Sequence, residues 1–121
     1  MATIMTIDDS PTIRRLIHVT ASMAGYTVIE AENGEDALTK LKEQEEKINL
    51  FIVDVHMPIM DGITFVKRLR QISQYNKTPV IMLTTESQKT KKQEGKSAGA
   101  TGWMLKPFKQ DVLLKVLQRM I

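Results

Sequence analysis

Short apolar runs alternate with longer stretches in which apolar residues recur at helical spacing, and this pair repeats five times along the chain. Each short run has the length of a β-strand, and each longer stretch predicts a helix with one apolar face. Such alternation is typical of an α/β fold, in which parallel strands are joined by helices that cover both faces of the sheet. The predicted strands fall at residues 3–7, 27–29, 50–53, 80–83 and 103–105.

Local signals predict where the helices begin and end. Ser10 suits an N-cap with Pro11 at the first helical position, and Gly25 suits the end of the first helix. A second helix is expected from Gly34 through Lys47, with a charged outer face. In the last helix the residues expected to face inward are Val112, Leu113, Val116, Leu117 and Met120.

The composition narrows the class of protein. A chain of 121 residues suits one domain, here residues 1–121, and contains no apolar run long enough to cross a bilayer. Cysteine is absent, which excludes disulfides and thiolate metal sites, and the net charge of +3 is mild. We therefore expect a cytoplasmic monomer that binds neither membrane nor nucleic acid.

Polar residues that could bind a metal ion or take part in a reaction follow four of the predicted strands. Asp8 and Asp9 follow the first strand, Asp54 the third, Thr84 the fourth and Lys106 the fifth. The carboxyl ends of parallel strands meet at one edge of the sheet, so these side chains should lie close together. A single aspartate after a strand would be unremarkable, but this set predicts a site.

Three clustered carboxylates need a counter-charge. At about 4 Å and an effective dielectric near 20, each close pair costs roughly 4 kcal/mol. Oxygen ligands without nitrogen or sulfur favour a hard cation such as Mg²⁺. Asp54, on the central strand, is then placed to form an aspartyl-phosphate, with the Thr84 hydroxyl and the Lys106 ammonium as contacts for phosphoryl oxygens.

The motifs around these residues resemble the response-regulator receiver family, and within it the stand-alone chemotaxis regulators called CheY-like. The resemblance covers the whole chain. The residues that carry it are Ile7–Asp8–Asp9–Ser10, the stretch from Val53 to Gly62, Thr84–Thr85, and Gly99–Ala100 through Trp103 to Lys106–Pro107–Phe108.

The resemblance implies a flavodoxin-like (βα)5 domain with strand order 2-1-3-4-5. It also implies that Asp54 accepts a phosphoryl group from a sensor histidine kinase, and that Thr84 and Lys106 sense the phosphate. The implied Mg²⁺ ligands are Asp8, Asp9, Asp54 and the backbone carbonyl of His56. Such a protein is not an enzyme that turns over a separate substrate; it promotes its own phosphorylation and slow dephosphorylation.

The region after Thr84 differs from the rest of the chain. Residues 84–102 contain no Val, Ile, Leu, Met, Phe, Tyr or Trp, so the fourth helix should have low stability, and Gly95 within it costs about another 1 kcal/mol. In the family, the position three residues before the lysine usually carries Tyr or Phe as a rotameric switch. Here it is Trp103, which we expect to act as the switch, the alternative being a half-exposed packing residue.

The fourth helix also carries a run of lysines, which predicts a basic face for an acidic partner, with a merely solvated face as the alternative. The expected partner surface consists of Lys89, Lys92, Lys96 and Trp103, with Lys91 beside them. His56 and Glu86 are expected to border the path of the water that removes the phosphoryl group.

Several functions remain open from the sequence. The resemblance suggests a chemotaxis kinase as donor and the flagellar motor switch, or a phosphatase, as partner. A phosphorelay intermediate that passes the group to a histidine phosphotransfer domain is an alternative of the same class. An Asp-nucleophile phosphatase would need a second acid where His56 stands, and a flavin-binding redox domain would need a phosphate-binding loop where Asp8 and Asp9 stand.

Overall fold

The computed structural model describes residues 2–85 and 89–121, and for residues 89–92 it describes the backbone alone. Its centre is a parallel sheet of five strands in the order β2-β1-β3-β4-β5, as predicted. The second strand is two residues longer at its carboxyl end than the sequence pattern indicated. The strands are β1 (Thr3–Ile7), β2 (Thr27–Ala31), β3 (Leu50–Asp54), β4 (Val80–Thr84) and β5 (Gly102–Leu105).

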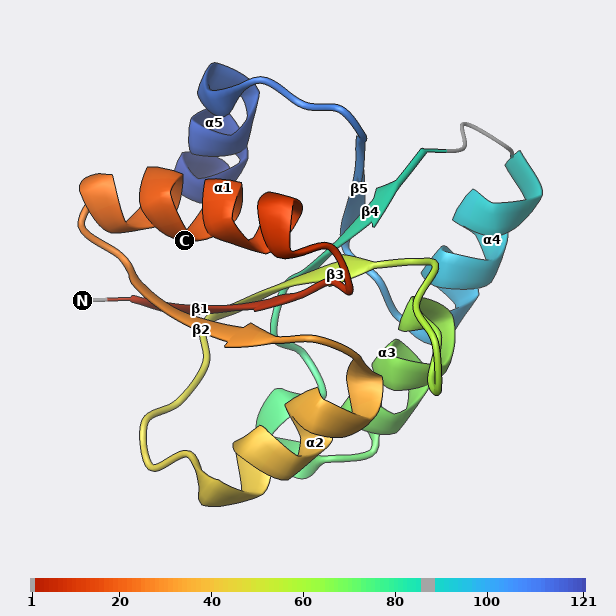
Figure 1. Ribbon diagram of the computed structural model, residues 1–121. Helices are drawn as coiled ribbons and strands as arrows, with labels where there is room; N and C mark the ends of the chain where they lie inside the picture. Colours follow the sequence, from red (N-terminus) through yellow and green to blue (C-terminus); the bar gives the residue numbers. More distant parts are fainter. Residues whose placement is uncertain (1, 86–88) are drawn as a thin grey trace.

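Five α-helices connect and cover these strands, with α1 and α5 on one face of the sheet and α2, α3 and α4 on the other (Figure 1). A short 3₁₀ turn, η1, lies at Ser73–Tyr75. The helices are α1 (Pro11–Met23), α2 (Gly34–Glu43), α3 (Gly62–Arg70), α4 (Lys89–Ala98) and α5 (Gln110–Met120).

Most helix signals in the sequence are confirmed. The Ser10 hydroxyl accepts a hydrogen bond from the backbone N–H of Ile13, and Gly25 has a φ of 95° just after α1. The prediction that the second helix continues through Lys47 is wrong, because the backbone of Gln44 is already extended. Val112 does not face the core either: its exposed fraction is 41%, whereas Leu113 and Leu117 are fully buried.

Side chains that alternate along the strands divide the core into two layers. On β3, Phe51 and Val53 contribute to the layer under α2 and α3, whereas Leu50 and Ile52 contribute to the layer under α1 and α5. All residues of β1, β3 and β4 are buried, as expected for parallel strands that are covered on both faces. This packing fixes the ends of the central strands, where the candidate site lies.

Arg70, the last residue of α3, contacts two connecting segments. Its guanidinium donates hydrogen bonds to the backbone carbonyls of Tyr75 (2.8 Å), Thr78 (2.6 Å) and Gly99 (2.7 and 3.1 Å). Burial lowers the pKa of this guanidinium below its usual value. Arg70 thereby joins the segment before β4 to the turn between α4 and β5.

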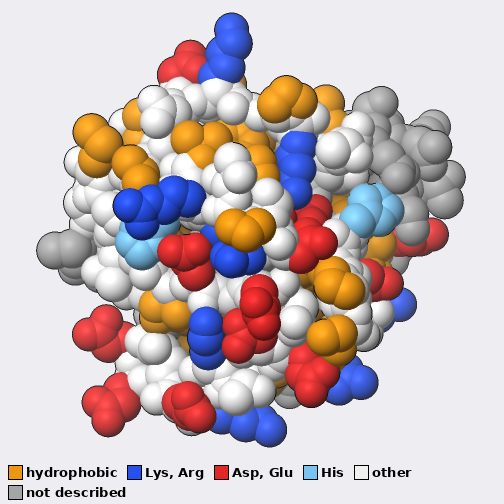
Figure 2. All heavy atoms as spheres, viewed as in Figure 1, with side chains coloured by type: hydrophobic (Ala, Val, Ile, Leu, Met, Phe, Trp, Pro, Cys, Tyr) orange, Lys and Arg blue, Asp and Glu red, His pale blue; other side chains and the backbone are white. Residues whose placement is uncertain are grey.

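No helix in the described part of the chain is long and apolar enough to cross a membrane. On the face shown in Figure 2, acidic and basic side chains are interspersed between small groups of hydrophobic ones.

Candidate functional site

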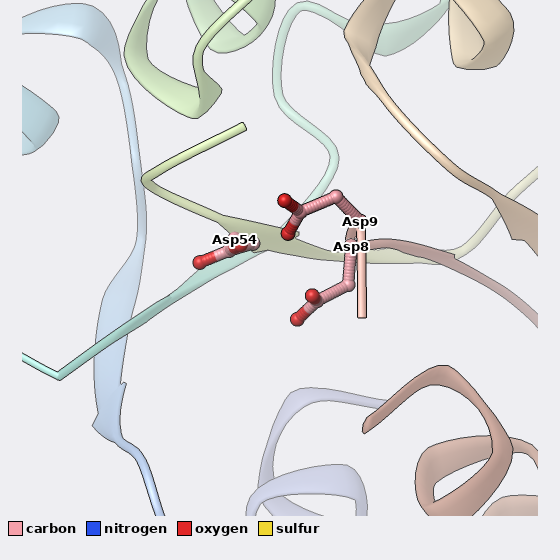
Figure 3. Close-up of side chains that lie close together, drawn as sticks. All are labelled: Asp8, Asp9 and Asp54. Carbon is pink, nitrogen blue, oxygen red and sulfur yellow. The ribbon is translucent and has the colours of Figure 1, made fainter. Parts of the chain in front are cut away.

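Three carboxylates meet at the carboxyl ends of the two central strands (Figure 3). Asp54 is the last residue of β3, and Asp8 and Asp9 follow directly after β1. Because Ile7 pairs with Val53 in the parallel register, the backbone brings Asp8 next to Asp54. One oxygen from each of the three carboxylates lies within 4.8 Å of the others. The predicted acidic cluster is therefore present.

The acids differ in their access to solvent. Asp8 is completely buried and Asp54 is 4% exposed, whereas Asp9 is exposed. The pKa of Asp54 is raised to about 6, chiefly because burial disfavours the charged form and also because of the negative charge of Asp8. The Lys106 ammonium and the backbone N–H of His56 oppose this rise. The raised pKa shows that the positive charge of Lys106 does not fully offset the cost of burying this carboxylate.

Lys106 supplies part of the missing positive charge. Its Nζ lies 2.8 Å from Asp8 Oδ2 and 3.3 Å from Asp54 Oδ1. Burial lowers the pKa of this ammonium, but the contacts with Asp8 and Asp54 outweigh that effect and raise it above its usual value. Lys106 is therefore the counter-ion of two acids, and its expected contact with a phosphoryl oxygen stays a prediction.

The cluster also fits a divalent cation. Three carboxylates face one ammonium group, which leaves an excess of negative charge. Both oxygens of the buried Asp8 carboxylate have a protein contact: Oδ1 accepts a hydrogen bond from the backbone N–H of Ser10, and Oδ2 lies 2.8 Å from the Lys106 ammonium. The three carboxylates together offer only oxygen ligands, which suit Mg²⁺.

Thr84 lies beside the cluster, at the end of β4. It is 1% exposed, and its backbone carbonyl accepts a hydrogen bond of 2.8 Å from the N–H of Lys106. The same register that pairs Thr84 with Leu105 thus places Lys106 at the mouth of the sheet. The structure brings Thr84 and Lys106 to the edge that carries the acids, as the positions after their strands predicted.

His56 follows Asp54 by two residues and presents its backbone to that acid. Its N–H lies 3.4 Å from Asp54 Oδ1, and its side chain is exposed. The prediction that its carbonyl binds the metal stays a prediction, because the structure carries no ion. Glu86, expected beside the water path, lies outside the described residues.

Trp103 is partly buried against the core layer under α3 and packs on Gly95 of α4. A Cβ added at Gly95 would overlap the indole ring, so glycine at this position makes room for the tryptophan. The sequence suggested only that Gly95 weakens the helix. Of the expected partner surface, Lys96 is exposed, while the side chains of Lys89 and Lys92 lie outside the described part.

Two surface cavities in the described part of the chain lie away from the acids. One of about 490 Å³ is lined by residues at the opposite end of the sheet, among them Lys47, Asn49 and Lys77. Another, of about 470 Å³, lies between α2 and α3.

A fold of this strand order, with three acids and a lysine at the ends of its central strands, matches the description of one family. The sequence pattern of the response regulator receiver domain matches residues 4–118, and the chain belongs to this family. Receiver domains bind Mg²⁺ at an acidic pocket, and the group formed by Asp8, Asp9 and Asp54 could hold such an ion.

Its relatives include chemotaxis proteins. The chain is 38% identical to the chemotaxis protein CheY1 of Helicobacter pylori over 116 residues, which cover 95% of this chain and 93% of that protein. It is 34% identical to part of the sensor histidine kinase CheAY of the same organism, covering 98% of this chain but 15% of the kinase. The crystal structure of the chemotaxis protein CheY4 of Vibrio cholerae superimposes with a TM-score of 0.94, at 48% identity, over 100% of this chain and 99% of that one. The chain is thus a CheY-like receiver domain.

Proposed function

We propose that this protein is a phosphorylation-dependent signalling switch in which Asp54 accepts a phosphoryl group from a phosphohistidine on a sensor histidine kinase. The observation that carries the proposal is the buried Asp54 carboxylate, which lies beside Asp8 and Asp9 and within 3.3 Å of the Lys106 ammonium. A carboxylate can act as the nucleophile in phosphoryl transfer when its surroundings offset the charge of the incoming group.

In the proposed reaction, an oxygen of Asp54 attacks the phosphorus as the nitrogen–phosphorus bond breaks, and the electron pair stays on the histidine. Asp8, Asp9 and Asp54, with the His56 carbonyl, would hold Mg²⁺, which supplies charge compensation for the phosphoryl oxygens. The Lys106 ammonium would leave Asp54 and pair with a phosphoryl oxygen, and the Thr84 hydroxyl would donate to another. The present contact between Lys106 and Asp54 would thus be replaced by a contact between Lys106 and the phosphate.

The output would be binding to a partner protein. Trp103 links the edge of the sheet to α4 through Gly95, so a change near Thr84 and Lys106 could reach the surface formed by Lys89, Lys92, Lys96 and Trp103. We propose an acidic partner for this surface, a flagellar motor switch protein or a phosphatase, and a cytoplasmic monomer as the active form.

A chemotaxis-type kinase is proposed as the donor because the chain resembles both a free-standing chemotaxis regulator and the portion of a sensor histidine kinase that it matches. The mild net charge of +3 favours a protein partner over a nucleic acid, which would call for a continuous basic surface.

The test is intact-protein mass spectrometry after incubation with acetyl phosphate and Mg²⁺. We expect the mass to increase by one phosphoryl group in the wild type and not in the Asp54→Asn variant, with an excess of chelator abolishing the increase. Asp61→Asn serves as a matched control, because Asp61 is an exposed acid seven residues further along that caps α3. A wild type that gains no phosphoryl group would refute the proposal.

A further inference from the structure

Arg14, on the first turn of α1, contacts the backbone of the acidic pair directly. Its Nη1 donates a hydrogen bond of 2.5 Å to the backbone carbonyl of Asp8. The Arg14 side chain is 17% exposed, so this contact is largely shielded from water. Arg14 lies outside the motifs on which the sequence predictions rested, and it is followed by a second arginine, Arg15, which is exposed.

The guanidinium of Arg14 is itself held in place from β2. Its Nε lies 3.3 Å from Glu30 Oε1, and the other oxygen of Glu30 lies 2.8 Å from Nδ1 of His18. The backbone carbonyl of Glu30 accepts a hydrogen bond of 2.6 Å from the Lys40 ammonium. Glu30 pairs in register with Thr6 of β1, two residues before Asp8. The arginine is thus fixed between the helix and the strand adjacent to the site.

The carbonyl that Arg14 binds belongs to the peptide group that joins Asp8 to Asp9. A peptide group is planar, so holding its oxygen also sets the direction in which the chain enters Asp9. The preceding peptide is fixed as well, because the N–H of Asp8 donates to the carbonyl of Ala31 at 3.1 Å. The exposed Asp9 therefore owes its place beside Asp8 and Asp54 to a backbone that is held on both sides of Asp8.

We infer that Arg14 is a positioning residue for the metal site: its guanidinium, clamped by Glu30, orients the Asp8–Asp9 peptide so that the carboxylates converge on Mg²⁺. The inference rests on the proposed function, since it names a residue that prepares the same site. Groups that orient metal ligands without touching the metal typically change metal affinity by 10- to 100-fold when they are removed.

Because Arg14 is charged, the direction in which its loss changes Mg²⁺ affinity distinguishes a positioning role from a charge effect. A cation close to a metal site repels the metal, so loss of the arginine would tighten Mg²⁺ binding if charge were its only contribution. Loss of positioning has the opposite effect and weakens binding. Arg14→Lys keeps the charge, but a single ammonium group does not reproduce the planar fork that reaches Asp8 and Glu30 together.

The experiment is a calorimetric titration of Mg²⁺ into the wild type, Arg14→Gln, Arg14→Lys and Glu30→Gln, with Arg15→Gln as the matched control. We expect both Arg14 variants to bind Mg²⁺ about tenfold more weakly, with a smaller loss in Glu30→Gln and no loss in Arg15→Gln. Urea denaturation in chelator shows which variants remain folded, and Arg14→Lys and Glu30→Gln carry the test if Arg14→Gln does not fold.

Unchanged or tighter binding in folded Arg14→Gln and Arg14→Lys would overturn the inference while the wild type still binds Mg²⁺ and accepts phosphate. A loss of the same size in Arg15→Gln would also overturn it, because a general charge effect would then account for the result. A wild type that binds no Mg²⁺ would instead refute the proposed function itself. The two failures are therefore distinguishable.

Discussion

The indole of Trp103 occupies the space that a side chain at Gly95 would fill. An ideal Cβ at Gly95 would lie 2.9 Å from Cη2 of Trp103 and closer still to the neighbouring ring carbon. In the part of α4 whose side chains are described, Ala98 is the buried apolar residue, and the Trp103 contact adds to its anchorage. The ring of Trp103, from β5, therefore contributes to the packing of α4.

Replacing Gly95 by alanine should force the ring outward. Alanine favours a helix over glycine by about 1 kcal/mol, but overpacking of a filled site costs about 1–3 kcal/mol. We expect Gly95→Ala to lower the free energy of unfolding by about 1 kcal/mol, to shift the Trp103 emission to longer wavelength and to speed amide exchange in α4. Ser97→Ala, at an exposed position of the same helix, is the control and should leave the emission unchanged.

The raised pKa of Asp54 predicts a pH-dependent stability in the absence of metal. The folded state binds the proton more tightly than the unfolded chain, so the contribution of Asp54 is favourable below pH 3.8 and is lost as the pH rises through about 6. In chelator, the free energy of unfolding of Asp54→Asn should therefore rise relative to that of the wild type by up to about 3 kcal/mol between pH 4 and 7. Urea denaturation across this range measures the difference, and a constant difference would contradict the prediction.

Removal of the Lys106 charge should make the thermal stability of the protein depend more strongly on Mg²⁺. Asp8 and Asp54 would lose their shared counter-ion, and breaking a buried ion pair on one side costs about 3–5 kcal/mol when solvent cannot compensate. We expect Lys106→Met to melt earlier than the wild type in chelator and to gain more stability from Mg²⁺. Lys109→Met, an exposed control three residues away, should respond to Mg²⁺ as the wild type does.

Arg70 is predicted to be a large contributor to stability away from the site. Its replacement by leucine leaves the carbonyls of Tyr75, Thr78 and Gly99 without these donors, which should cost about 3 kcal/mol in urea denaturation. Arg68→Leu, two residues earlier on the exposed side of α3, should change the unfolding free energy by less than about 0.5 kcal/mol. Equal effects of the two substitutions would argue against the role of the Arg70 hydrogen bonds.

Ile59 adopts a φ of 70° in the loop that follows the candidate phosphoacceptor, and its side chain is 76% exposed. The N–H of Met60 donates to the carbonyl of Pro58 at 2.7 Å, so Ile59 is the centre of a tight γ-turn that is strained for a β-branched residue. Asparagine tolerates positive φ, and we expect Ile59→Asn to raise the free energy of unfolding by about 1 kcal/mol. Thermal denaturation would reveal a lower melting temperature if this assignment were wrong.

The acidic cluster was predictable because it follows from strand ends. Once residues 3–7 and 50–53 are assigned to parallel strands, Asp8 and Asp54 must emerge at the same edge of the sheet. The apolar runs of β1, β3 and β4 were long enough to assign, and caps such as Ser10 act over only three residues. Two predictions about helices were wrong. The charged residues up to Lys47 resemble the solvent-exposed face of a helix, so the second helix was predicted to be too long. Val112 fits the helical spacing of the apolar residues, but no other element in the described part of the chain covers it.

The sequence by itself determined the alternation of strands and helices and the family that its motifs resemble. It also determined the edge of the sheet at which Asp8, Asp9, Asp54, Thr84 and Lys106 emerge. These features are accessible because periodicity and strand ends are local properties of the chain. Only the tertiary structure decided which distant groups meet. Arg14 reaches the Asp8 carbonyl because Glu30 on β2 holds it there, and Gly95 accommodates Trp103 because β5 passes beneath α4. Such contacts depend on side-chain direction and on close packing between elements, and neither is encoded in the spacing of residues along the chain.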